Sequence, residues 1–194
     1  GSKILQKYKK KITVVPYSID PKLFQLDGNG KKLLTKLKKQ FSNKKILLFV
    51  GRLVPYKGLE YLINALPEVV KRHDDVMLLI IGDGILKPEL KRLVKKLNLD
   101  GHVKFLPEIA NTKLPPFYHL TDLFVLPSVY KAEAFGIVQL EAMTCSKPVV
   151  STNVFGSGIS YVNINNETGF VVEPYNSKEL ATAIIKLLDD KHLS

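Results

Sequence analysis

The chain has 194 residues, of which 45% are hydrophobic and 24% charged, values typical of a folded globular domain with a substantial core. Its longest apolar runs are too short to cross a bilayer and it opens on no signal-peptide pattern, so we expect a cytoplasmic protein. A single cysteine, Cys145, excludes an internal disulfide and a thiolate metal cluster. Gly1-Ser2 looks like the remnant of a cleaved tag, so the domain is expected to span residues 3–194.

The formal net charge of +11 is concentrated near the start of the chain. Residues 3–45 hold thirteen lysines against Asp20 and Asp27, so the whole excess lies there. Such a stretch could contact nucleic acid, an anionic membrane surface or an acidic partner. Because no arginine and no regular pattern of aromatic interleaving accompanies the lysines, a solvated lysine-rich face is the favoured interpretation, and no nucleic acid partner is expected.

Strand and helix patterns alternate along the chain. A short β-branched strand is predicted at 12–15, before Pro16. Further strands are predicted at 46–50, 76–81, 103–106, 123–126, 149–151 and 169–172, and those at 46–50 and 123–126 are apolar enough to be fully buried. Helical spacing of apolar residues appears at 31–39, 59–70, 86–97, 114–120, after 136, and at 176–188. This order predicts an α/β fold with a Rossmann-like, doubly wound parallel sheet.

In such sheets ligands bind beyond the carboxyl ends of the strands. Loops containing glycine follow the predicted strands at 51–58, at 82–84 and around 136. The sequence therefore predicts a ligand site where these three loops converge.

The stretch from Glu133 to Glu141 is the main candidate for that site. Glu133 is predicted to lie in a loop just before a helix and Glu141 about two turns inside it, which separates the carboxylates by roughly 10–12 Å. That distance matches the span of a nucleotide sugar from its sugar ring to its ribose. The helix N-terminus between them would attract a phosphate, and Gly136 lets the backbone approach such a ligand. The competing interpretation is a capped helix with two solvated glutamates.

Two cations flank the turn after the strand at 46–50. Arg52 offers a bidentate fork and Lys57 a point charge, the groups that recognise an anionic diphosphate. If a diphosphate is the leaving group, electrostatic stabilisation of this type is worth about 2.7–4 kcal/mol per group. No Asp-x-Asp motif is visible, so the cations could replace a metal ion and no metal site is expected. The alternative is that both are surface side chains framing a turn.

With these residues, the chain resembles the C-terminal, donor-binding domain of family 4 glycosyltransferases of the GT-B fold. The most specific parts are 51–58 and the Glu-x7-Glu unit at 133–141, and the segments 147–151 and 167–174 are similar too. The resemblance implies metal-independent, retaining transfer, without a cofactor, from a nucleotide-diphosphate sugar to a glycan or lipid-linked acceptor. A GDP-sugar such as GDP-mannose is the first expectation for the donor, and a UDP-sugar the second.

The resemblance also implies a role for each matching residue. Arg52 and Lys57 would bind the donor diphosphate, and Glu133 would contact the donor sugar near its reacting carbon; these three are the expected catalytic residues. Glu141 would accept hydrogen bonds from the ribose hydroxyls, and the base would lie near Pro107 to Ile109. The remaining expected donor-binding residues are Gly51, Ile109, Phe135, Gly136 and Ile137.

Three departures from the family pattern stand out. Ala134 occupies a position where glycine is common, and Tyr17-Ser18 replaces the usual Asn-Gly. The segment 154–163 lacks the glutamate of the family's Gly-Gly-x-x-Glu pattern, and is more similar to a subgroup that includes bacterial and archaeal mannosyltransferases. A GT-B enzyme also needs a second Rossmann-like domain with the acceptor site. We therefore expect this chain to be one half of an enzyme and to transfer no sugar alone.

A different class of function stays open on the sequence. The chain could be a basic α/β binding module for nucleic acid or anionic membrane, without transferase ancestry, whose affinity follows the lysines of 3–45 and collapses with salt. The transferase interpretation predicts affinity that follows Arg52, Lys57 and Glu141. In a third possibility, the full enzyme uses its basic segment to sit at the inner face of an anionic membrane, near a lipid-linked acceptor.

Overall fold

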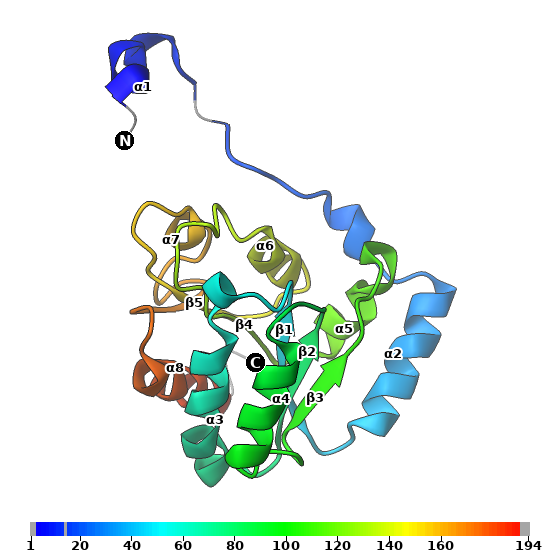
Figure 1. Cartoon of the computed structure of the whole chain (residues 1–194). Helices are drawn as coiled ribbons and strands as arrows, with labels where there is room; N and C mark the ends of the chain where they lie inside the picture. The colour runs from blue at the N-terminus through cyan, green and yellow to red at the C-terminus, as the bar shows by residue number, and fades with distance from the viewer. Residues whose placement is uncertain (1–2, 14, 191–194) are drawn as a thin grey trace.

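The computed structural model describes residues 3–13 and 15–190. Within them, six parallel strands form one sheet in the order β3-β2-β1-β4-β5-β6 (Figure 1). The strands are β1 Lys45–Val50, β2 Val76–Ile81, β3 Val103–Leu106, β4 Leu123–Leu126, β5 Val149–Thr152 and β6 Gly169–Val172. The predicted doubly wound, Rossmann-like sheet is therefore confirmed.

The central strand β1 is covered on both faces. It pairs with β2 from Lys45↔Val76 to Val50↔Ile81 and with β4 on its other side. Successive side chains point to opposite faces of the sheet, so Leu47 enters one apolar cluster and Leu48 the other, and both are fully buried. A strand covered on both faces needs apolar residues at every position, which is why its sequence does not alternate.

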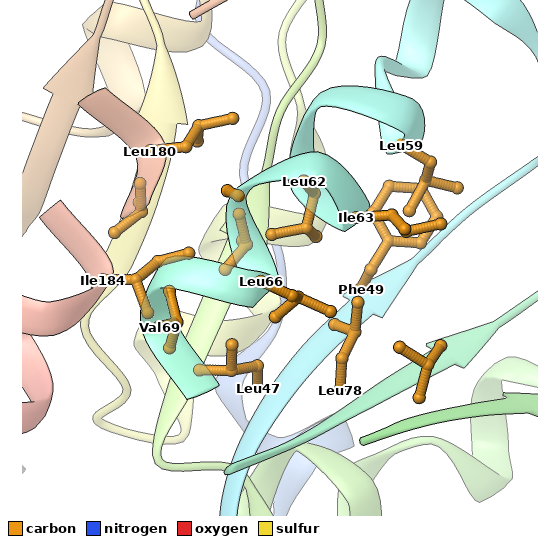
Figure 2. Packing of buried hydrophobic residues seen from close by; sticks show 14 of the residues in the cluster. Leu47, Phe49, Leu59, Leu62, Ile63, Leu66, Val69, Leu78, Leu180 and Ile184 are labelled. Atoms are coloured by element: carbon orange, nitrogen blue, oxygen red, sulfur yellow. The ribbon is translucent and has the colours of Figure 1, made fainter. Parts of the chain in front are cut away.

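One face of the sheet carries α3 Leu59–Arg72, α4 Lys87–Lys96 and α8 Ser177–Asp189 (Figure 1). Figure 2 shows the side chains of α3 lying between the strands and α8, with Leu66 near Leu47 and Leu78, and Val69 near Ile184. Burial of one such side chain stabilises the fold by roughly 1.5–3 kcal/mol. The apolar cluster on this face is the larger of the two.

The opposite face carries α2 Gly28–Gln40, α5 Pro115–Leu120, α6 Ile137–Thr144 and the short α7 Ile159–Val162. All helices predicted from the apolar spacing are present, and two short helices, α7 and the N-terminal α1 Lys3–Lys7, are additional. Cys145 is buried in this cluster, and burial raises the pKa of its thiol to about 11, as expected for a core residue. No helix among the described residues is both long and apolar enough to cross a membrane.

The N-terminal segment differs from the prediction. It comprises α1 Lys3–Lys7 and short 3-10 helices at Lys9–Lys11 (η1) and Pro21–Phe24 (η2), and α1 lies apart from the sheet and its helices (Figure 1). The strand predicted at 12–15 is wrong for its described residues 12, 13 and 15, and Val14 lies outside the described residues. In the described part of the chain no other strand lies beside this run, and a strand needs a neighbour for its backbone hydrogen bonds.

The lysines of this segment are exposed, as the solvated-face interpretation predicts. Exposed lysine side chains run from α1 and η1 along α2 to the turn before β1, and they are Lys7, Lys9, Lys10, Lys11, Lys22, Lys31, Lys32, Lys36, Lys38, Lys39 and Lys44. The lysines of α1 and η1 are close in sequence to several exposed apolar side chains, including Ile4, Leu5 and Tyr8.

Candidate functional site

The candidate site lies where the connectivity of the sheet reverses. β1 and β4 are neighbours, but the chain continues from β1 to β2 on one side and from β4 to β5 on the other. The connections that begin with the loops 51–58 and 127–136, which follow β1 and β4, therefore lead to opposite sides of the sheet. Ligands of open α/β sheets bind at such a switch point.

A pocket of about 450 Å³ opens at this edge of the sheet. It brings together residues that follow three different strands and residues from α6. Five of the nine expected donor-binding residues line it, namely Gly51, Arg52, Ile109, Ile137 and Glu141. Its wall also includes Asp83 after β2, and Glu108 and Asn111 after β3. The end of β3, where the base was expected, therefore shares one cavity with Arg52 and Glu141.

Lys57 and Glu133, 76 residues apart, form a buried ion pair. Lys57 ends the 3-10 helix η3 Pro55–Lys57, and its Nζ donates to Oε2 of Glu133, while Oγ of Ser128 donates to the same oxygen over 3.1 Å. Lys57 is 8% exposed and Glu133 9%. Arg52, in contrast, is exposed and donates to the hydroxyl of Tyr56 over 2.9 Å. The surface interpretation of both cations is therefore wrong for Lys57.

Two glycines in the left-handed conformation shape the loops that bring Lys57 and Glu133 together. Gly58 has φ 64°, and a Cβ on it would lie 2.1 Å from the carbonyl oxygen of Pro127 in the loop after β4. The backbone N–H of Val129 donates to the carbonyl of Tyr56 over 2.8 Å, which also joins the two loops. Gly136 has φ 70° and precedes α6. Any other residue at Gly58 would push the loops apart and separate Lys57 from Glu133.

The helix α6 begins at Ile137, as the apolar spacing after 136 predicts. Glu141 is its fifth residue and so lies in its second turn, not two full turns inside it. Glu133 lies in the preceding loop, as predicted. The N–H of Gln139 donates to the carbonyl of Gly136 over 2.9 Å, and in the described part of the chain no side chain caps the N–H groups of Ile137 and Val138. The interpretation as a capped helix with two solvated glutamates is therefore wrong.

Glu141 is half-buried in the pocket wall and bonded to a buried phenol. The hydroxyl of Tyr118 donates to Oε2 of Glu141 over 2.5 Å. Burial raises the pKa of Glu141, and the hydrogen bond from Tyr118 acts in the opposite direction. Burial and the nearby Glu141 carboxylate raise the pKa of Tyr118 well above its ordinary value, so the phenol stays protonated and acts as the donor.

The segment after β5 supports the loop that carries Glu133. Oγ of Ser157 donates to the backbone carbonyl of Glu133, and the N–H of Gly158 donates to the carbonyl of Ala134 over 2.7 Å. The ring of Phe135 lies 5.7 Å from that of Tyr17 and 6.3 Å from that of Tyr161. Two stretches that depart from the family pattern, around 17 and in 154–163, therefore meet at Phe135.

Sequence reasoning missed three residues that position the site: Ser128, Ser157 and Tyr118. Ser128 had a usable signal, since it lies two residues after the end of β4, near the same edge of the sheet as Gly51 after β1. Tyr118 gave no such signal, because a tyrosine within an apolar helical pattern is expected to be a core residue. Ser157 reaches Glu133 only through the fold, from a distance of 24 residues in sequence.

The family model described as glycosyl transferases group 1 matches residues 33–194. Among curated proteins, alpha-D-kanosaminyltransferase of Streptomyces kanamyceticus is 38% identical over 148 residues, which cover 76% of this chain and 37% of that protein. D-inositol 3-phosphate glycosyltransferase of Rhodococcus jostii is 33% identical over 152 residues, which cover 75% of this chain and 33% of that protein. The chain thus spans well under half the length of these curated relatives.

Solved structures of glycosyltransferases share the fold. Anabaena HepE in complex with UDP superposes with a TM-score of 0.78 at 29% identity, over 91% of this chain and 47% of that one. The C-terminal domain of the group 1 protein LpcC from Francisella tularensis superposes with a TM-score of 0.75 at 27% identity, over 91% of this chain and 90% of that domain. An unrelated basic binding module is therefore not favoured. The chain belongs to the group 1 glycosyltransferases.

Proposed function

We propose that this chain is the donor-binding domain of a family 4, retaining glycosyltransferase of the GT-B type, whose other domain carries the acceptor site. The share of its relatives' length that it spans, and its match to a separate C-terminal domain, support this division. The retaining outcome rests on the family resemblance of the 51–58 and 133–141 motifs.

The observation that carries the proposal is the single pocket shared by Arg52, Glu141 and the start of α6. The donor diphosphate would lie between Arg52, Lys57 and the first N–H groups of α6. As the bond from the sugar to the diphosphate breaks, negative charge grows on the leaving oxygens, and these groups are in place before the reaction. Removal of one preorganised group of this type typically costs about 2.7–4 kcal/mol, and the two cations would supply the charge that a metal supplies elsewhere.

Glu133 would face the donor sugar. Lys57 and Ser128 both contact its Oε2, which fixes the carboxylate and leaves Oε1 to accept from sugar hydroxyls. Lys57 keeps further N–H donors beyond the one used for Glu133, so the same ammonium could bridge Glu133 and a phosphate oxygen. The expected catalytic trio of Glu133, Arg52 and Lys57 would then act as one connected group.

The nucleotide base would occupy the part of the pocket formed by Glu108 and Ile109, and the ribose would lie against Glu141. The family resemblance favours a GDP-sugar such as GDP-mannose, and hence a mannosyltransferase. The neighbour HepE is solved with UDP and with UDP-glucose, which supports a UDP-sugar as the second candidate.

The test is calorimetric titration of the chain with GDP, UDP, GDP-mannose and UDP-glucose at two salt concentrations, with Glu141→Ala in parallel. We expect one nucleotide to bind selectively and the variant to bind it at least tenfold more weakly. A triple variant of Lys9, Lys10 and Lys11 to glutamine is the control and should bind like wild type. Binding that ignores the base and Glu141 but collapses with salt would overturn the proposal in favour of a basic module.

Peripheral contact of the full enzyme with an anionic membrane is a second, separate proposal. The exposed lysines of η1 lie beside the exposed apolar side chains of Ile4, Leu5 and Tyr8, a combination suited to a negatively charged lipid surface. Such contact would bring the donor site close to a lipid-linked acceptor. We expect the chain by itself to transfer no sugar, and detectable transfer would contradict the two-domain proposal.

A further inference from the structure

Tyr118 is a buried residue whose single side-chain polar atom reaches the candidate site. Its side chain is 0% exposed, and it belongs to α5, which follows β3 and packs against α2. Its hydroxyl donates to Oε2 of Glu141 in α6 over 2.5 Å. One hydrogen bond therefore ties a core side chain to a carboxylate in the pocket wall.

Neighbouring rings hold the phenol in place. The ring of Phe24, in η2, lies edge-on at 5.9 Å between centroids, and the ring of Phe124, in β4, lies at 5.8 Å with a tilt of 40°. A close-packed interior leaves such a ring no room to change rotamer. The hydroxyl of Tyr118 is therefore a donor fixed in space, to which Glu141 must adapt.

The two carboxylate oxygens of Glu141 then differ. Oε2 accepts from Tyr118, and within residues 3–13 and 15–190 no protein group donates to Oε1. Glu141 lines the pocket together with Gly51 and Ile109. Burial raises its pKa and the phenol lowers it, so Tyr118 favours the charged carboxylate, which only accepts hydrogen bonds.

We propose that Tyr118 is a positioning residue for the donor nucleotide: its phenol holds Oε2 of Glu141 so that Oε1 is presented to the ribose hydroxyls. The proposal rests on the proposed function, which places the ribose against Glu141. A carboxylate already held in its bound orientation loses less conformational freedom when the ribose arrives, so it binds more tightly than a rotating one.

The test is Tyr118→Phe, which removes the hydroxyl and keeps the ring. Wild type and variant are titrated with GDP and UDP and with their 2′,3′-dideoxy forms. For the nucleotide that binds, we expect wild type to prefer the ribose form by about tenfold or more, since hydrogen bonds to a charged group are involved. The variant should lose roughly three- to tenfold of that preference. Its affinity for the dideoxy form should be unchanged.

The control is Tyr61→Phe, which removes a phenol hydroxyl in α3, where the ring lies 5.4 Å from that of Tyr175 and outside the pocket. It should keep the wild-type preference. If Glu141→Ala loses the preference but Tyr118→Phe keeps it in full, the positioning role is wrong while the ribose assignment stands. If wild type shows no preference at all, the ribose assignment itself fails, and the positioning role with it.

A second measurement needs no nucleotide. An NMR titration of the Glu141 side-chain carboxyl carbon compares its pKa in wild type and Tyr118→Phe. The pKa should be higher in the variant, because the hydrogen bond that lowers it is gone. An unchanged pKa, in a variant that melts at the wild-type temperature, would show that the phenol does not act on the carboxylate and would overturn the proposal.

Discussion

Glu133 and Glu141 belong to one loop-helix unit, yet the fold places their carboxylates in opposite situations. Glu133 is buried against a cation, Lys57, with Ser128 on the same oxygen. Glu141 is half-buried and bonded to a neutral phenol. The charge of Glu133 is balanced by that of Lys57 in the protein without ligand. For Glu141, part of the free-energy cost of removing its carboxylate from water is not offset.

The difference separates two roles: Glu133 supports the architecture of the domain, and Glu141 is available to a ligand. A buried charge whose partner is removed costs several kcal/mol, so the Lys57–Glu133 pair cannot be broken without loss of stability. Glu141 instead lies where a ligand hydroxyl would improve its hydrogen bonding. The comparison leads to four predictions, of decreasing expected effect.

The largest effect is expected for Lys57→Ala, which leaves Glu133 buried without its cation. We expect a loss of about 3–5 kcal/mol in the free energy of unfolding, measured by urea denaturation. The matched control is Lys87→Ala, which breaks an ion pair with the exposed Asp83 and should shift the midpoint little. Replacing Lys57 and Glu133 together by apolar residues should cost less than either change alone. A double variant less stable than both single variants would contradict this account.

The next effect is expected for Gly136→Ala, at the junction between the two glutamates. The added Cβ would lie 2.6 Å from Cδ2 of Leu126 and 2.7 Å from Nε2 of Gln139, at a residue with φ 70°. We expect destabilisation of about 1–3 kcal/mol and weaker nucleotide binding. The control is Gly28→Ala at the start of α2, where nothing lies within 4 Å. Equal effects of the two changes would refute a special role of the Gly136 conformation.

A smaller effect of opposite sign is expected for Glu141→Gln. Burial raises the folded-state pKa of Glu141 above its ordinary value of 4.5, so its charge opposes folding at pH 7. The neutral variant should therefore melt higher at pH 7, on the order of 1–3 °C, while binding nucleotide more weakly. The gain should shrink as pH falls through the folded-state pKa and vanish below 4.5. A gain independent of pH would show that charge is not its cause.

The smallest effect on the folded domain is expected for the lysines of η1. Changing Lys9, Lys10 and Lys11 to glutamine should leave the melting temperature and the nucleotide affinity unchanged, because these side chains are exposed. It should weaken cosedimentation with vesicles rich in anionic lipid, and salt should weaken the wild type in the same way. Unaltered cosedimentation would argue against the membrane proposal without touching the donor site.

Much of the site was accessible from the sequence because its residues follow strands. Gly51, Arg52 and Ile109 come after apolar runs that could be recognised as strands, and the carboxyl ends of parallel strands meet at one edge. The ion pair of Lys57 with Glu133 was not accessible. Each was assigned to the donor, but their direct contact depends on how closely Gly58 lets two loops approach.

The amino-acid sequence by itself determined the order of strands and helices, the edge of the sheet where a ligand would bind, and the residue types available there. Periodicity and glycine placement are local properties, so they can be read along the chain. The tertiary structure alone decided that 12, 13 and 15 form no strand, that Lys57 is buried, and that Tyr118 holds Glu141. These outcomes depend on contacts between residues distant in the chain, which no local pattern encodes.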